Sequence, residues 1–171
     1  MFKNIILTGF MGVGKTSVGT RLAKDLGYTF VDIDKLIEAD QDMPISAIFS
    51  KHGEPFFREV EEKIIQRVMM GEGQVVSTGG GAVIRDVNRK AFMKGGCVVC
   101  LTASPAVIYE RIKHETHRPL LQTADPKAKI RELLDSRAQF YARADLCIDT
   151  SDKSVDEVIK AIKERLGHAY C

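Results

Sequence analysis

The stretch that most constrains the fold is GFMGVGKT at residues 9–16, which matches the pattern G-x-x-x-x-G-K-[ST]. An apolar run, NIILT at residues 4–8, leads into it, and a helix-like segment from Lys15 to Leu26 follows and ends at Gly27. A strand, a glycine-rich loop and a helix N-terminus in this order surround a phosphate group with backbone N–H groups. The chain is therefore expected to bind a nucleoside triphosphate at this loop.

The residue types in this loop predict how the phosphates are held. Lys15 is expected to reach the β and γ phosphates, and the Thr16 hydroxyl is expected to bind Mg²⁺. The sequences N-K-x-D and D-x-x-G, which GTP switch proteins use, do not occur in the chain, so phosphoryl transfer is favoured over switching. The predicted nucleotide-binding residues of the loop are Gly12, Val13, Gly14, Lys15, Thr16 and Ser17.

Four further apolar runs of strand length lie at 29–33, 74–78, 97–101 and 146–149. Because they are almost continuously apolar, they indicate strands that are covered on both faces in a parallel sheet. We therefore predict an α/β fold, a three-layer α/β/α P-loop kinase arrangement with a five-stranded parallel sheet. Helix signals between the runs are a segment from Pro55 to Met70, N-caps before proline at Ser104-Pro105 and Asp125-Pro126, and a capping box from Ser154 to Glu157 in a last helix closed by Gly167.

Two segments depart from the simple alternation of strand and helix. The segment 34–70 is mostly helical and lies between the second and third strands, where it predicts a helical substrate-binding insertion. The segment 114–125 carries charged, proline and polar residues between two helices, and it predicts a mobile lid loop. No linker rich in proline, glycine and serine divides the chain, so residues 1–171 are expected to form a single domain.

Charge and cysteine usage limit the partners and the compartment. With 25 basic and 23 acidic residues the formal net charge is +2, too balanced for a nucleic-acid-binding surface. No apolar stretch approaches the roughly 20 residues of a membrane span. Cys97 and Cys100 stand three apart in an expected strand and so point to opposite faces, which argues against a shared disulfide or metal. We expect reduced thiols in a cytoplasmic protein.

Beyond the loop, further motifs occur in order: D-x-D at Asp32 and Asp34, FFRE at 56–59, TGGGAV at 78–83, RPLL at 118–121 and the arginine of DSRAQFYARAD, Arg137. In this order and spacing they resemble the shikimate kinase family across essentially the whole chain. The resemblance implies transfer of the γ-phosphate of ATP to the 3-hydroxyl of shikimate, with Mg²⁺ as the cofactor, in cytoplasmic aromatic amino-acid biosynthesis. We expect a monomer that binds ATP and shikimate but neither nucleic acid nor a membrane.

The two aspartates are expected at the carboxyl end of the second strand, side by side on the face that overlooks the ligand crevice. The resemblance implies that Asp34 hydrogen-bonds the acceptor hydroxyls and is the proposed base, and that Asp32 supports Mg²⁺ through water. An alternative is that Asp34 is simply the N-cap of a helix that begins at Lys35.

Arg58 has two interpretations. It precedes Glu61 and Glu62 by three and four residues on an expected helix, so it could form an ordinary intrahelical ion pair. The resemblance instead implies that its guanidinium group binds a substrate carboxylate, with Glu61 orienting it and Phe57 packing on the substrate ring. Arg137 matches the second carboxylate-binding arginine of the family.

Three glycines in a row, Gly79, Gly80 and Gly81, form a second glycine-rich segment. No Lys-Ser or Lys-Thr pair follows them, so they are not a second phosphate loop. The resemblance implies a wall without side chains, where a compact polyhydroxy ring lies against backbone N–H groups. The alternative is a tight turn between a strand and a helix.

Three basic residues complete the predicted nucleotide side. The resemblance implies that Arg118 lies in the lid and neutralises the transferring phosphoryl group while the closed lid excludes water. It also implies that Arg111 stacks on adenine, the alternative being an exposed helix surface. Lys153 lies in the loop after the fifth strand, where some family members carry an arginine and a proline, and it is expected to contact the nucleotide.

Three rival functions stay open from the sequence. Gluconate kinase shares the expected fold and nucleotide loop, a nucleoside-monophosphate kinase would need more arginines for a second phosphate, and a non-catalytic ATP-binding module would need no acceptor chemistry. The pair Arg58 and Arg137, together with TGGGAV, favours an acceptor that carries a carboxylate.

Overall fold

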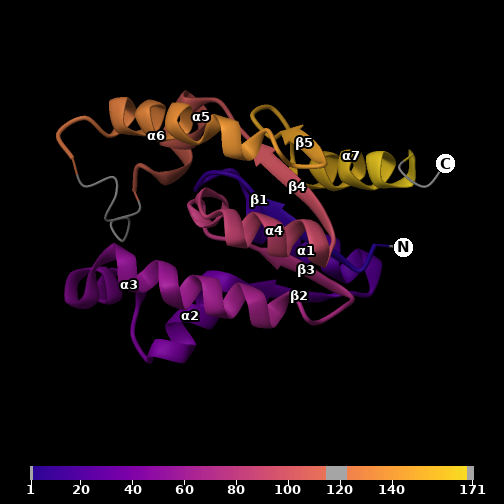
Figure 1. Ribbon diagram of the computed structural model, residues 1–171. Coiled ribbons are helices and arrows are strands. Elements are labelled where there is room, and N and C mark those ends of the chain that lie inside the picture. Colours follow the sequence, from indigo (N-terminus) through magenta and orange to yellow (C-terminus); the bar gives the residue numbers. More distant parts are fainter. Residues whose placement is uncertain (1, 115–122, 169–171) are drawn as a thin grey trace.

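A computed structural model of the chain describes residues 2–114 and 123–168 (Figure 1). The five strands form one sheet in the order β2-β3-β1-β4-β5, and all neighbouring pairs are parallel. The elements are β1 (Asn4–Thr8), α1 (Lys15–Leu26), β2 (Thr29–Asp32), α2 (Ile33–Gln41), α3 (Ile45–Val68), β3 (Gln74–Ser77), a 3₁₀ turn η1 (Ala82–Ile84), α4 (Asp86–Gly95), β4 (Cys97–Thr102), α5 (Pro105–Ile112), α6 (Pro126–Tyr141), β5 (Leu146–Asp149) and α7 (Val155–His168).

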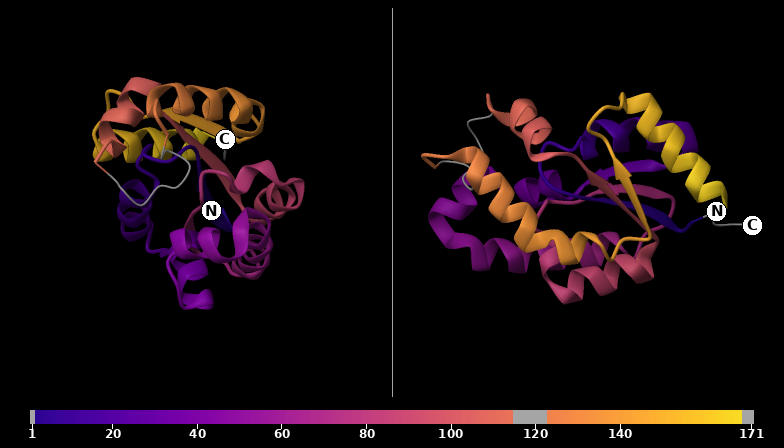
Figure 2. Two further views of the ribbon diagram at one scale, coloured as in Figure 1. Left: turned by 90° about the vertical axis from the view of Figure 1, so that its left-hand side faces the viewer. Right: turned by 90° about the horizontal axis from the view of Figure 1, so that it is seen from above.

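The sheet is the middle of three layers. Helices α1 and α7 pack against each other over one face, and α3 and α4 pack against each other over the opposite face (Figures 1 and 2). The residues of β1 are all buried, as are the first five of β4, which explains why these strands have continuously apolar sequences. The predicted α/β/α architecture with a five-stranded parallel sheet is confirmed.

Several helix ends lie where their capping residues predict. The side chain of Ser104 accepts a hydrogen bond from the Val107 amide at the start of α5, and Asp125 caps α6 in the same way. At the start of α7, the Ser154 hydroxyl accepts from the Glu157 amide while the Glu157 carboxylate accepts from the Ser154 amide. These contacts satisfy N–H groups that a helix start otherwise leaves unpaired.

Three predicted boundaries were wrong. The second strand ends at Asp32, so Asp34 lies in the first turn of α2 and not on the strand. Helix α3 begins at Ile45 and not at Pro55; a kink at Gly53, with φ 81° and ψ 170°, divides it just before the proline. Helix α7 continues through Gly167 to His168, because a helix tolerates a glycine at a modest cost in free energy.

The segment from 34 to 70 contains all of α3 and all of α2 but its first residue, and both helices stand between β2 and β3 in the chain (Figure 1). Of the predicted lid at 114–125, residues 115–122 lie outside the described part of the chain, and with them Arg118. No helix of the described residues is long and apolar enough to cross a membrane. The thiols of Cys97, Cys100 and Cys147 are free, and burial raises the pKa of Cys97 to about 11 and that of Cys100 to about 12.

Candidate active site

The loop between β1 and α1 is wound by three glycines. Gly9, Gly12 and Gly14 have φ angles of 128°, 77° and 96°, which side chains rarely permit. A Cβ on Gly9 would also lie 2.1 Å from the backbone oxygen of Leu101. The Lys15 Nζ donates to the carbonyl oxygens of Gly9 and Phe10 at 2.8 Å each, so the lysine folds back over the loop that it follows.

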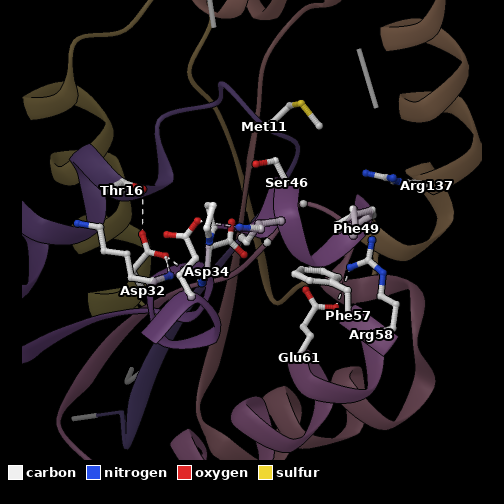
Figure 3. Close-up of a pocket in the computed structure, with 17 residues that line it drawn as sticks. Met11, Thr16, Asp32, Asp34, Ser46, Phe49, Phe57, Arg58, Glu61 and Arg137 are labelled. Atoms are coloured by element: carbon white, nitrogen blue, oxygen red, sulfur yellow. Dashed lines mark hydrogen bonds and ion pairs between the residues drawn. The ribbon is translucent and has the colours of Figure 1, made fainter. Parts of the chain in front are cut away.

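Thr16, Asp32 and Asp34 lie where this loop meets the end of β2. The Thr16 hydroxyl is 3.3 Å from Asp32 Oδ2, and Asp32 Oδ1 accepts from the amides of Asp34 and Lys35. Asp32, and not Asp34, is therefore the N-cap of α2, which corrects the alternative interpretation of Asp34. The Asp34 side chain is not the cap of α2, and Asp34 lines the neighbouring cavity (Figure 3).

Two cavities adjoin at this point. The larger, of about 490 Å³, lies between the glycine segment, the first turn of α2 and the helix α3 (Figure 3). The smaller, of about 190 Å³, lies over the phosphate loop and is lined by Lys15 and Ser17 among others. The two cavities share five lining residues, which are Met11, Thr16, Asp32, Asp34 and Gly80.

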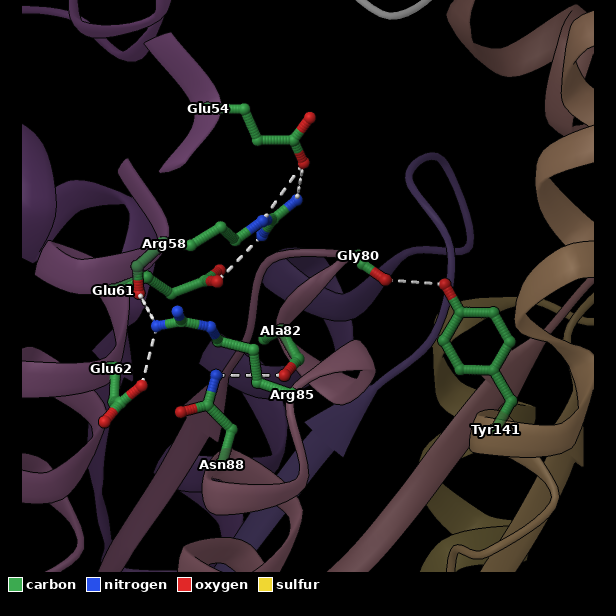
Figure 4. Close-up of polar contacts among 9 residues, drawn as sticks. All are labelled: Glu54, Arg58, Glu61, Glu62, Gly80, Ala82, Arg85, Asn88 and Tyr141. Atoms are coloured by element: carbon green, nitrogen blue, oxygen red, sulfur yellow. Dashed lines mark hydrogen bonds and ion pairs between the residues drawn. The ribbon is translucent and has the colours of Figure 1, made fainter. Parts of the chain in front are cut away.

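Arg58 lines the larger cavity and is held by two carboxylates (Figure 4). Its Nη1 donates to Glu61 Oε2 at 2.7 Å, and its Nε and Nη2 donate to Glu54 Oε1 at 3.2 and 3.1 Å. Its guanidinium carbon lies 5.1 Å from the centroid of the Phe57 ring. Glu62, the other predicted partner, instead accepts from Arg85 at 2.7 Å. The intrahelical ion pair therefore exists, and it orients Arg58 along the cavity wall.

The electrostatics of this pair follow from burial. Burial raises the pKa of Glu61, whose side chain is 0% exposed, although the ion pair with Arg58 acts in the opposite direction. For Arg58, burial alone would lower the pKa, but the ion pairs with Glu61 and Glu54 outweigh it and the pKa is raised. Arg58 thus keeps its charge at the cavity wall. The second oxygen of Glu61, Oε1, has no hydrogen-bond partner among the described residues.

Arg137 reaches the same cavity from α6, on another part of the chain (Figure 3). Only 5% of the residue is exposed, and its guanidinium carbon lies 5.7 Å from the centroid of the Phe10 ring. The structure therefore brings together the two arginines that the sequence analysis assigns to a carboxylate. Two guanidinium groups on the wall of one cavity suit a carboxylate, since guanidinium groups form paired, charge-assisted hydrogen bonds with carboxylate oxygens.

The three consecutive glycines line the cavity, and none of them has a positive φ angle. Their need for glycine is steric instead. A Cβ on Gly81 would lie 2.3 Å from Arg58 Nη2, and one on Gly79 would lie 3.0 Å from a carboxylate oxygen of both Asp34 and Glu61. The segment is therefore a turn and also a wall, because the turn passes where the charged side chains of the cavity converge.

Beside the phosphate loop, the Arg111 guanidinium group forms hydrogen bonds with two other segments of the chain. It donates to Gly12 O at 3.2 Å and to the hydroxyl and backbone oxygens of Thr150 at 3.1 and 2.7 Å, while the Thr150 hydroxyl donates to Val13 O at 3.1 Å. Arg111 is exposed, but its hydrogen bonds join the phosphate loop to the loop after β5. It is therefore not a freely solvated helix residue. Lys153 lies exposed in that second loop.

Several residues that line the larger cavity, or that hold its lining residues in place, were not predicted from the sequence. Phe49 packs its ring against that of Phe57, with 4.8 Å between the centroids. Glu54 does not line the cavity but holds Arg58, and it could have been found from its spacing, since it stands four residues before Arg58 on the helix. No local pattern marks the others, which are Met11, Lys35, Glu38, Pro44, Ile45 and Ser46.

The strand order, the phosphate loop and the larger cavity that adjoins it define a P-loop kinase. A sequence model of the family described as shikimate kinase matches residues 11–167. The chain is 52% identical over 163 residues to a shikimate kinase of Thermodesulfovibrio yellowstonii, covering 95% of this chain and 94% of that protein. It is 47% identical over 160 residues to one of Geobacter metallireducens, covering 94% of this chain and 89% of the other.

Solved structures agree with the sequence comparison. A shikimate kinase from Acinetobacter baumannii in complex with shikimate superposes with a TM-score of 0.95 at 34% identity, covering 98% of this chain and 94% of that chain. One from Aquifex aeolicus gives 0.87 at 31% identity, covering 98% of each chain. A gluconokinase from Sinorhizobium meliloti, at 21% identity and a TM-score of 0.62, covers 98% of this chain and 94% of its own and shares the fold alone. The chain belongs to the shikimate kinase family, which is a family of ATP-dependent enzymes.

Proposed function

We propose that the chain transfers the γ-phosphate of ATP to the 3-hydroxyl of shikimate, giving shikimate 3-phosphate and ADP, in aromatic amino-acid biosynthesis. The observation that carries this proposal is that the two cavities share a wall at Thr16, Asp32, Asp34 and Gly80. A nucleotide on the phosphate loop and a small acid in the larger cavity would then meet across that wall. Phosphoryl transfer needs such positioning more than it needs covalent help from the protein.

The acceptor is held by groups that match its chemistry. Arg58 and Arg137 bind the carboxylate, and Phe57 packs against the ring. Gly79, Gly80 and Gly81 leave room for the ring to approach the backbone. A volume of about 490 Å³ is in the range that small ligands occupy.

Asp34 is placed to act on the reacting hydroxyl. It lines both cavities, so its carboxylate stands between the acceptor and the phosphate loop. It accepts a hydrogen bond from the hydroxyl, directs the oxygen at the γ-phosphate and takes the proton as the new bond forms. Because the transition state is loose, orientation of the oxygen contributes more than the basicity of the carboxylate.

The nucleotide is held by the backbone amides and side chains of residues 12–17, with Lys15 turning from the loop carbonyls to the β and γ phosphates. Arg111 and Lys153 flank the adenine side. Arg118 belongs to the predicted lid and is proposed to neutralise the transferring group. The chain is proposed to act as a cytoplasmic monomer, without nucleic acid or membrane partners.

The oxygen donors beside the loop fit Mg²⁺. The Thr16 hydroxyl and the Asp32 carboxylate are hard ligands, 3.3 Å apart, and they line the phosphate cavity. Among the described residues no group of three or more histidine, cysteine or acidic side chains could hold a metal ion by itself. This agrees with a cation that is shared with the nucleotide phosphates, where it would neutralise charge on the transferring group.

A coupled ADP-release assay with ATP and Mg²⁺ tests the proposal, with shikimate, gluconate, AMP or no acceptor in parallel reactions. Turnover with shikimate alone is the expected result. Turnover with another acceptor would keep the kinase activity and overturn the assignments of Arg58 and Arg137. Binding of ATP without turnover on any acceptor would instead favour a regulatory ATP-binding module.

A further inference from the structure

A tyrosine that does not line the larger cavity forms a hydrogen bond to the glycine segment 79–81, which does line it. The Tyr141 hydroxyl, on the last turn of α6, donates to the carbonyl oxygen of Gly80 at 2.6 Å (Figure 4). The tyrosine is 7% exposed, and the bond itself is partly buried. On the far side of the same turn, the Asn88 amide donates to the Ala82 carbonyl at 3.0 Å. Two buried side chains thus hold two successive parts of the segment.

The direction of the Gly80 carbonyl has a consequence for the cavity. The described chain has no cis peptide bond, so the N–H of Gly81 points opposite to the carbonyl of Gly80 within one planar group. Tyr141 approaches the turn from one side, whereas Arg58 and Glu61 lie on the other (Figure 4). Fixing the carbonyl toward Tyr141 therefore directs the Gly81 N–H away from α6, toward the side where Arg58 stands.

Tyr141 also stands one helical turn after Arg137, so both side chains lie on the same face of α6. The Arg137 guanidinium is close enough to oppose the rise that burial causes in the pKa of Tyr141. A tyrosine hydroxyl has one proton to donate and two lone pairs that can accept. It can therefore donate to Gly80 while its lone pairs face the neighbouring guanidinium group.

We propose that Tyr141 is a positioning residue for the acceptor, which links Arg137 to the glycine wall through its hydroxyl. The proposal rests on the function proposed above and adds a residue to it. Arg137 on α6 and the Gly81 amide beside β3 belong to separate parts of the fold. The Tyr141 hydroxyl fixes their distance and orientation relative to each other before the acceptor binds, which reduces the cost of ordering the site.

The test compares Tyr141→Phe with a matched control, Tyr28→Phe. The Tyr28 hydroxyl also donates to a backbone carbonyl, Phe2 O at 2.8 Å, but at the opposite end of β1 from the phosphate loop. Steady-state kinetics with shikimate and with ATP, together with thermal unfolding, are measured for both variants. We expect Tyr141→Phe to raise KM for shikimate about threefold to tenfold, the usual worth of one buried hydrogen bond, and to leave KM for ATP unchanged. Tyr28→Phe should leave both KM values unchanged.

Two results would overturn the proposal: an unchanged KM for shikimate in Tyr141→Phe, or equal rises in KM for shikimate and ATP. A second measurement tests the link to Arg137. In an Arg137→Ala background, Tyr141→Phe should raise KM for shikimate by a smaller factor than in the wild type, because part of the linkage is already lost. If Tyr141→Phe raised KM for shikimate by the same factor in the wild type and in Arg137→Ala, the proposed link between Tyr141 and Arg137 would be overturned. Failure of the proposed function is distinct, since it would appear as wild-type protein without turnover on shikimate.

Discussion

The phosphate loop is contained in residues 9–17, whereas the acceptor cavity is assembled from segments as far apart in the chain as Asp34 and Arg137. The loop is defined by the conformation of its own backbone, with three glycines at positive φ. The cavity is defined by contacts between side chains from α2, α3, α6 and the turn after β3. A local motif can therefore specify the nucleotide side, but the acceptor side exists only when the whole fold is formed.

The two sites also use glycine for different reasons. A Cβ on Gly9 would meet the backbone of β4, which cannot move aside, and the φ angle of 128° is itself unfavourable for a side chain. A Cβ on Gly81 would meet the far end of the Arg58 side chain, which can move. Glycine is therefore required at position 9 by the backbone of the fold, and at position 81 by the position of the Arg58 guanidinium group.

The largest effect is expected for Lys15→Ala. Removing the ammonium group from the phosphate loop should lower kcat/KM by about 10³-fold or more, as other losses of a charge-neutralising group in phosphoryl transfer do. The fold should be retained, since the lysine contacts the carbonyls of its own loop. Kinetics and thermal unfolding measure the two quantities. Lys24→Ala, an exposed lysine on the same helix, is the control; normal turnover in Lys15→Ala would refute the nucleotide site.

The second effect concerns the acceptor side alone. Arg58→Ala should weaken use of shikimate by about 2–5 kcal/mol in kcat/KM, because it removes a charged partner from a desolvated contact, while KM for ATP changes little. The variant also leaves the buried Glu61 without its cation, so some loss of stability is expected. Arg67→Ala, on the same helix but 64% exposed at the side chain, should change neither KM. Equal effects on both substrates would contradict the separation of the two sites.

The glycine comparison gives a third test. Gly9→Ala should lower the free energy of unfolding by about 1–3 kcal/mol, measured by urea denaturation, because backbone atoms must shift. Gly81→Ala should change stability less but raise KM for shikimate about tenfold, since the added methyl group displaces the Arg58 guanidinium. The proposed difference between the two glycines would be contradicted if Gly81→Ala were less stable than Gly9→Ala, or if its KM for shikimate were normal.

The smallest effect is a pH dependence of stability. Burial raises the pKa of Tyr141 to about 12, whereas the unfolded side chain titrates near about 10. Between these values the unfolded chain has lost the proton that the folded chain keeps, so stability falls as pH rises. Wild type should exceed Tyr141→Phe by about 1 kcal/mol at pH 8 and lose that advantage by about pH 11. Urea denaturation of both proteins at each pH measures this difference in the free energy of unfolding. A difference that stays the same from about pH 8 to about pH 11 would contradict the raised pKa of Tyr141.

The fold was largely predictable because its determinants are local. The strand at 4–8 is fully buried and is a continuous apolar run with its predicted ends. The strand at 146–149 also has its predicted ends, although only one of its four residues is buried. Capping side chains mark the starts of α5, α6 and α7. The start of α3 was missed because Gly53 and Pro55 look like the beginning of a helix, whereas they mark a kink within it. Asp34 was placed on a strand because two aspartates in D-x-D do not reveal which of them caps the next helix.

The acceptor site was less predictable from the residues themselves. Arg58 alone was ambiguous; the structure shows its intrahelical ion pair and its place on the cavity wall, and its binding role stays a prediction. Tyr141 was not found, because its partner Gly80 stands 61 residues away in the chain. The roles of the catalytic and binding residues stay predictions until they are tested.

The central claim is that Arg58 recognises the acceptor carboxylate beside the phosphate loop. The most direct measurement is kcat/KM for shikimate and for its methyl ester, with the wild type and with Arg58→Ala. The wild type should prefer the acid by about 30-fold or more, and Arg58→Ala should lose most of that preference because the charge that reads the carboxylate is gone. Equal use of acid and ester by the wild type, or an undiminished preference in the variant, would contradict the account.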